Sequence, residues 1–215
     1  IIQPEGLSSE QQAALQSRWE VLLAALRGAD SSATDSATRE FVTTLRSIHP
    51  TFYPVPWRLQ LEVTYNDLAP FRIARLLYAA AALLLLLGLS PNQHRWRNLG
   101  LGIAAGAFLF HGGGIFTRVI LGGSPPVSNF YETMLWLPFV AVLLSAVLER
   151  IYPRGFFAFA GTLLAAIVLL LADHLPLDSS ISPVVAVLRS NLWLTNHVLT
   201  IVGSYAPFAV ATVLA

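Results

Sequence analysis

Five histidines are the side chains of this 215-residue sequence best suited to metal ligation or proton chemistry near neutral pH. His49 and His94 stand in polar stretches, where solvated surface positions are expected. His174 follows an apolar run and is expected to lie at a solvated helix end. His111 and His197 fall within long apolar segments, so these two are the candidates for a function.

His111 lies near the middle of its apolar segment and is followed by three glycines. Arg118 comes seven residues later, so the two side chains are expected on one helix face, about two turns apart. One interpretation is a functional ionisable site inside a membrane, where such groups are costly. The other is a neutral imidazole that hydrogen-bonds a neighbouring helix, with the glycines permitting close packing. The sequence leaves both interpretations open.

His197 stands at the start of the last apolar segment, in Asn191-Leu-Trp-Leu-Thr-Asn-His197. A neutral imidazole at a membrane–water boundary can ligate a metal or a heme iron while staying reachable from outside. Trp193, one turn earlier, offers a flat apolar surface suited to packing on a macrocycle. The alternative is an interfacial histidine beside a tryptophan of the aromatic belt.

A loop between two apolar segments, residues 122–132, concentrates polar groups. Two prolines restrict its backbone, and Ser128 or Asn129 can cap the helix that follows. Glu132 then falls in the first helical turn, where the positive end of the helix dipole favours a carboxylate. Arg118 is close enough in sequence to pair with this glutamate.

These residues must be positioned by long apolar segments. The sequence is 55% hydrophobic and 12% charged, about half the charge of an average soluble domain. Five segments approach the roughly 20 residues that cross about 30 Å of hydrocarbon, and they lack the polar faces of soluble helices. They comprise residues 73–90, 98–121, 131–149, 155–172 and 192–215. The expected fold is therefore all-α, a multi-pass transmembrane helical bundle of about five spans.

Residues 1–72 differ, because they hold eight of the twelve acidic residues. We expect a small helical extramembrane segment with an amphipathic helix over 7–28, a polar break over 29–36 and a second helix. Pro54 and Pro56 are expected to keep the next stretch extended. Two short helices make a thin core for an independent domain.

The absence of cysteine and the net charge exclude some kinds of chemistry, and the positions of the arginines predict the membrane topology. The sequence has no cysteine, which excludes disulfides and thiolate sites, and its net charge of +1 argues against nucleic acid binding. Two arginines lie in each of the turns 91–97 and 150–154, so both turns are expected to be cytoplasmic. The loops 122–130 and 173–191, and with them residues 1–72, are then expected outside.

Two motifs carry a resemblance. Arg118 followed by Gly123-Ser-Pro-Pro-Val-Ser-Asn-Phe-Tyr-Glu132 resembles the R-x4-G-x-x-P-x-S-N-x-Y-E stretch of the CcsA (ResC) cytochrome c assembly proteins. The segment Trp193-Leu-Thr-Asn-His-Val198, with Ser204-Tyr-Ala206 beyond it, is similar to the family's W-L-x-x-H-V and S-Y-A segments. The resemblance covers about residues 73–215.

The resemblance implies a role in cytochrome c biogenesis. Proteins of this family carry heme b (iron protoporphyrin IX) to the outer face of the bacterial plasma membrane. They present it, with a CcsB (ResB) type partner that is separate or fused, to apocytochrome c. Heme vinyl groups then form thioethers with the cysteines of a C-x-x-C-H motif, which needs ferrous heme. His197 corresponds to the first of two outward histidines that hold the iron. The candidate cofactor-binding residues are His197 (also the metal ligand), Trp193, His111, Arg118, Asn129, Tyr131 and Glu132.

The sequence also departs from the family pattern. Position 124 is serine where many relatives have histidine, and the family's tryptophan-rich WWD segment and second outward histidine would lie beyond residue 215. The chain begins Ile-Ile and ends in an apolar run, so we expect a fragment without catalytic residues of its own. Two other functions stay open: a transporter or permease subunit whose pathway His111 and Arg118 line, and a structural membrane scaffold.

Overall fold

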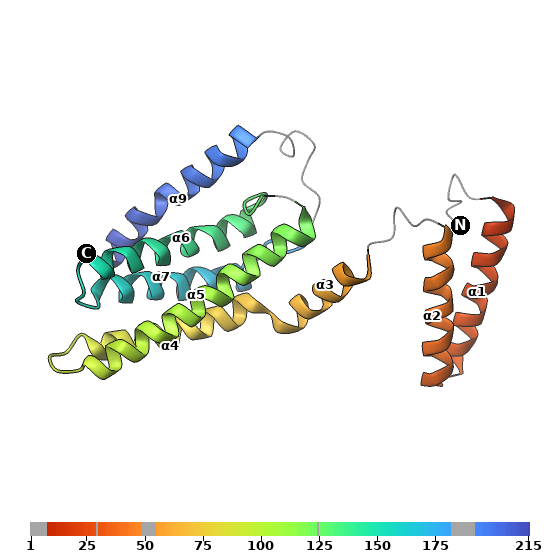
Figure 1. Ribbon diagram of the computed structural model, residues 1–215, viewed down its shortest axis with the longest axis horizontal. Coiled ribbons are helices and arrows are strands. Elements are labelled where there is room, and N and C mark those ends of the chain that lie inside the picture. Colours follow the sequence, from red (N-terminus) through yellow and green to blue (C-terminus); the bar gives the residue numbers. More distant parts are fainter. Residues whose placement is uncertain (1–7, 29, 49–54, 124, 182–191) are drawn as a thin grey trace. The chain divides into compact units, whose positions relative to one another are not determined.

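The computed structural model describes residues 8–28, 30–48, 55–123, 125–181 and 192–215. Every regular element in these ranges is a helix, which confirms the all-α class (Figure 1). The chain divides into two compact units, Ile1–Leu59 and Gln60–Ala215.

The first unit contains α1 (Ser9–Arg27) and α2 (Ser31–Ile48). Ser8 caps α1, because its side chain accepts a hydrogen bond from a backbone N–H of the first turn. Leu22 is the buried residue of α1 and Ala37 that of α2. The core of these two helices is as thin as expected.

The polar break before α2 is shorter than the predicted range 29–36. The side chain of Asp30 accepts hydrogen bonds from the backbone N–H of Ser32 at 2.9 Å and of Ala33 at 3.4 Å. These bonds satisfy the first turn, so α2 begins at Ser31. Together with the Ser32 hydroxyl, the largest cause, they hold the pKa of the Asp30 carboxyl below its usual range.

A third helix, α3 (Pro56–Leu68), replaces the extended stretch predicted at Pro56. The prediction was wrong because proline is tolerated in the first turn of a helix, where its missing N–H leaves no bond unmade. Ala69, with φ 42°, separates α3 from α4 just before a proline. The boundary between the compact units falls inside α3, and the extramembrane position of residues 1–72 stays a prediction. Residues 49–54, with His49 and Pro54, lie outside the described residues.

The second unit is a bundle of long apolar helices. They are α4 (Pro70–Gly88), α5 (His94–Gly122), α6 (Phe130–Ile151), α7 (Phe156–His174) and α9 (Leu192–Leu214). Five segments are long and apolar enough to cross a membrane, and they match the predicted spans to within a few residues, except that α3 extends the first at its start. The chain is a multi-pass membrane protein.

Small residues let these helices pack closely. α4 packs along α5 and α7, α6 packs on α7, and α9 packs on α6 and α7. A Cβ atom added at Gly161 of α7 would lie 2.4 Å from the Ser145 hydroxyl of α6, so only glycine permits this approach. The main core cluster draws on α4 to α7: Ala74, Tyr78, Ala107, Ile115, Leu135, Val142, Ala165, Ala166 and Leu169.

The antiparallel course of the spans separates two ends of the bundle. The end of α5, the start of α6, the end of α7 and the start of α9 lie at one end (Figure 1). The α4–α5 turn and the α6–α7 turn lie at the other. The first of these, called here the site end, carries Arg118, Glu132 and His197.

Candidate functional site

The first turn of α6 is shaped by the polar loop before it. Asn129 has an extended backbone and caps the helix, because its side-chain oxygen accepts the Glu132 N–H at 2.8 Å. Of the two candidate caps, Asn129 is the one found. The cap fixes Glu132 in the first turn, where the helix dipole favours its charge.

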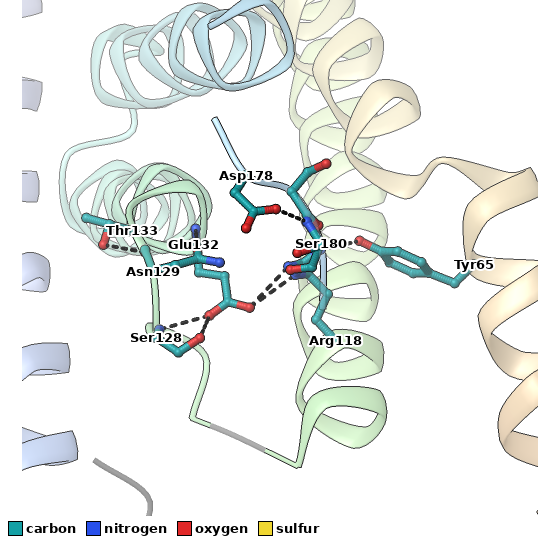
Figure 2. Close-up of polar contacts among 9 residues, drawn as sticks. Tyr65, Arg118, Ser128, Asn129, Glu132, Thr133, Asp178 and Ser180 are labelled. Atoms are coloured by element: carbon teal, nitrogen blue, oxygen red, sulfur yellow. Dashed lines mark hydrogen bonds and ion pairs between the residues drawn. The ribbon is translucent and has the colours of Figure 1, made fainter. Parts of the chain in front are cut away.

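Glu132 forms the ion pair with Arg118 that the sequence predicted (Figure 2). Both Nε and Nη2 of Arg118 donate to one carboxylate oxygen, at 3.3 and 3.2 Å. The other carboxylate oxygen accepts the Ser128 N–H at 2.8 Å and the Ser128 hydroxyl. Arg118 is 5% exposed and Glu132 6%, so the pair is buried and the carboxylate is fully hydrogen-bonded.

The remaining N–H groups of Arg118 reach two other parts of the chain. Nη1 donates to the Tyr65 hydroxyl of α3 at 3.4 Å and to the Ser179 carbonyl at 3.0 Å, and Nη2 donates to the Ser180 carbonyl at 3.2 Å. Figure 2 shows Arg118 between Glu132 on one side and Tyr65 on the other. All five N–H groups of the guanidinium are therefore engaged. We call Tyr65, Arg118, Ser128, Asn129, Glu132 and the two carbonyls the Arg118 cluster.

Asp178 holds the turn that presents these carbonyls. Its side chain accepts the Ser180 N–H at 2.9 Å. Hydrogen bonds from Ser180, first from its side chain, hold the pKa of the Asp178 carboxyl below its usual range, and the charge of Arg118 adds to this. Asp178 therefore stabilises the turn fully above its ordinary pKa, and this contribution is lost as the pH falls through the lowered value.

Tyr131 lies beside the cluster. Its ring centre is 5.1 Å from the Arg118 guanidinium carbon, a cation–π distance. A partly polar pocket of about 190 Å³ adjoins both side chains. Its other lining residues are Tyr65, Asn66, Ala69, Pro70, Phe71, Arg72, Asp173 and Ser179.

His111 is completely buried among helices α4 to α6. Its Nε2 lies 3.0 Å from the Leu135 carbonyl, which can only accept, so Nε2 carries the proton. Nδ1 lies 3.4 Å from the Tyr78 hydroxyl, the donor of that longer contact. Both ring nitrogens are occupied, which favours the structural interpretation of His111 over iron ligation.

His197 is exposed in the second turn of α9, at the site end. The Trp136 indole N–H of α6 donates to the Leu199 carbonyl at 3.2 Å and so ties this part of α9 to α6. Trp193 belongs to α9, but its side chain lies outside the described residues. In the described part of the chain no three His, Cys, Asp or Glu side chains gather as a metal site. A heme iron needs only one or two axial ligands, which a single exposed imidazole can begin to supply.

The two other histidines that the structure describes take the places expected of them, whereas the surface position of His49 stays a prediction. His94 begins α5 and is exposed. His174 ends α7, where its Nδ1 lies 2.9 Å from the Leu170 carbonyl.

Sequence reasoning missed Tyr65, Trp136 and Tyr78. Each forms one hydrogen bond with a residue of another helix. No local sequence motif predicts a contact of this kind.

The chain is similar in sequence to several known proteins. Protein NrfI of Wolinella succinogenes is 34% identical over 108 residues, half of this chain and 12% of the relative. Cytochrome c biogenesis protein CcsA of Synechococcus sp. strain CC9605 is 31% identical over 153 residues, 67% of this chain and 50% of the relative. The CcsA of Synechococcus sp. strain CC9902 is 34% identical over 94 residues, 43% of this chain and 31% of the relative. No model of a known protein family matches the chain.

The fold and the site define a multi-pass helical membrane protein with a buried ion-pair cluster at one end of its bundle. The chain is a homologue of the CcsA cytochrome c biogenesis proteins, which confirms the resemblance carried by its two motifs. Its match spans at most half the length of these curated relatives.

Proposed function

We propose that this chain serves in cytochrome c biogenesis by holding heme at the site end of its bundle for covalent attachment to apocytochrome c. The observation that carries the proposal is the exposed imidazole of His197 near the start of α9. The hydrogen bond from Trp136 to the Leu199 carbonyl ties this part of α9 to α6, and α6 begins with the CcsA-like motif. The names of the relatives support the process.

Five of the seven candidate residues have a role in this proposal. His197 supplies an axial ligand to the iron of heme b, and Trp193 packs on the macrocycle. Arg118, Asn129 and Glu132 position the end of the bundle, since their polar groups are engaged within the protein. Heme is the substrate, and the apocytochrome supplies the two cysteines that form the thioethers.

The proposal includes a topology and a partner. The site end faces outward from a bacterial plasma membrane, because the arginine-rich turns at the other end favour the cytoplasm. A CcsB (ResB) type protein, separate or fused, completes the heme site together with the chain that the longer relatives have in addition.

The test is heme content. The protein is produced with its partner in a heme-synthesising bacterium and purified in detergent, and heme is measured by its absorbance and by the pyridine hemochrome. We expect His197→Ala to lose most of the heme, because the iron loses a ligand. His94→Ala, an exposed histidine at the other end, is the matched control and should retain it.

Unchanged heme content in the His197 variant overturns the ligand assignment, and a wild-type protein without heme overturns the proposal. A scaffold predicts that both variants still support formation of covalently bound heme in a reporter cytochrome c. The transporter alternative is disfavoured, because His111 and Arg118 are buried and paired with protein groups.

A further inference from the structure

Two adjoining pockets lie between α5 and α6 toward the end of the bundle opposite the site end. One, of about 320 Å³, is lined by Arg97, Leu101, Ala146, Glu149, Arg150 and Pro153. The other, of about 190 Å³, is lined by Leu101, Ala104, Ala105, Phe108, Val142, Leu143, Ser145, Ala146, Ala158 and Thr162. Leu101 and Ala146 line both, so the pockets form one hollow, called here the α5–α6 groove.

The groove is apolar along its deeper part. Alanines and branched side chains line it as far as Phe108, whose ring stacks on Phe139 at a centroid distance of 4.5 Å. This part lies within the candidate spans. A hydrocarbon chain fits such a lining, because the alanines leave space beside a helix that packs only sparsely on its neighbour.

The mouth of the groove is cationic. The Arg97 side chain passes beside Gly155, whose φ of +89° favours glycine at this position. Its Nη1 donates to the Pro153 carbonyl at 2.9 Å. Its Nε is buried, and among the described residues it has no hydrogen-bond partner. A buried donor of this kind is unfavourable unless an acceptor from outside the chain supplies the bond.

The carboxylate among the described residues that line the mouth is already engaged. Glu149 caps α7, because its two oxygens accept the N–H groups of Gly155 at 2.6 Å and Ala158 at 3.3 Å. Arg97 and the exposed Arg150 therefore leave a positive balance. Two exposed aromatic residues in the adjacent turns, Trp96 and Tyr152, are typical of a membrane–water boundary.

We propose that the α5–α6 groove binds one anionic phospholipid. Its phosphate lies at Arg97 and Arg150, and one acyl chain runs past Leu101 and Ala146 toward Phe108. Charge complementarity selects this occupant: the mouth offers two guanidinium groups and an unused donor, whereas the interior is lined mostly by apolar side chains, with the Ser145 hydroxyl as its free polar group among the described residues. Basic pockets between transmembrane helices bind anionic headgroups in this way.

The headgroup is tested by native mass spectrometry of the purified protein in micelles containing equal amounts of phosphatidylglycerol and phosphatidylcholine. The wild type should retain one phosphatidylglycerol in preference to phosphatidylcholine. Arg97→Gln should weaken phosphatidylglycerol binding about fivefold. Arg95→Gln removes an equal charge two residues away, outside the groove, and should leave binding unchanged.

The acyl chain is tested without a change of charge. Ala146→Phe places a ring in the groove from an exposed position, so the helix packing is spared, and it should reduce binding at least as much as the arginine variant. Val147→Phe, at the adjacent exposed position outside the groove, is the control. Equal retention of the two lipids by the wild type overturns the proposal. So does an equal loss in the two arginine variants, or in the two phenylalanine variants.

Discussion

At the scale of single residues, Arg118 and Glu132 form a buried ion pair, a contact that is costly to break on one side only. A buried ion pair does not by itself make a protein more stable, but removing one partner leaves a buried charge without compensation. Every hydrogen-bonding atom of both side chains has a partner here, from Glu132 to the two serine carbonyls. The main role of the pair is therefore to connect chain segments at the site end, and not to add stability by its charge interaction alone.

We therefore expect Arg118→Leu to lower the free energy of unfolding by about 3–5 kcal/mol, because Glu132 stays buried and charged. The measurement is thermal unfolding in detergent. Combining it with Glu132→Gln should lose less than the sum of the two single variants. Arg18→Leu breaks an exposed pair with Glu40 and should change stability by no more than about 1 kcal/mol. Additive single variants would contradict the coupling.

His111 leads to a second prediction at this scale. His111→Ala removes the donor to the Leu135 carbonyl and leaves the Tyr78 hydroxyl unpaired in a buried place. We expect a loss of roughly 1–3 kcal/mol, measured by thermal unfolding in detergent. His94→Ala, at an exposed position, should have little effect. If the His111 variant lost heme while keeping its stability, iron ligation would replace the structural role.

At the scale of elements, α6 organises the site. Its cap and first turn hold Glu132, its second turn offers the Leu135 carbonyl to α5, and the same turn extends Trp136 to α9. One helix therefore sets the end of α5 and the start of α9 relative to each other. Any change that shifts α6 is expected to disturb the cluster and His197 together.

The contact between α6 and α7 allows a direct test of this dependence. Gly161→Ala would place a methyl group 2.5 Å from the Ser145 Cβ atom, so the two helices must separate. We expect lower thermal stability and, in a protein that binds heme, less heme. Gly102→Ala, in α5, meets nothing within 4 Å and should be neutral or slightly stabilising. Equal effects of the two variants would exclude close packing as the cause.

At the scale of the whole molecule, the expected orientation in the membrane can be tested by labelling single introduced cysteines. The chain has no cysteine of its own, so it adds no background labelling. Pro176→Cys, beyond the end of α7, should react with a membrane-impermeant maleimide in intact cells. Tyr152→Cys, in the turn after α6, should react only after the membrane is permeabilised. Both positions are exposed, so access to solvent within the protein is matched. The reverse pattern would place the site end in the cytoplasm.

Much of this molecule was predictable from local sequence. Apolar runs of about 20 residues predicted the spans, since backbone groups in hydrocarbon must pair within a helix. The motif ending at Glu132 predicted both a capped helix and its ion pair, because an N-cap and a first-turn carboxylate act within one turn. Pro56 misled the prediction, since proline either breaks a helix or begins one.

By itself the sequence determined the helical class, the spans and the partner of Arg118 that lies 14 residues away. The tertiary structure alone decided that Tyr65 and the Ser179 carbonyl, 53 and 61 residues away, share that guanidinium. It also decided that His111 is enclosed while His197 stays exposed, although both lie in apolar segments. The physical reason is that helix formation and capping act within a few turns, whereas burial and long-range hydrogen bonds depend on which helix faces meet.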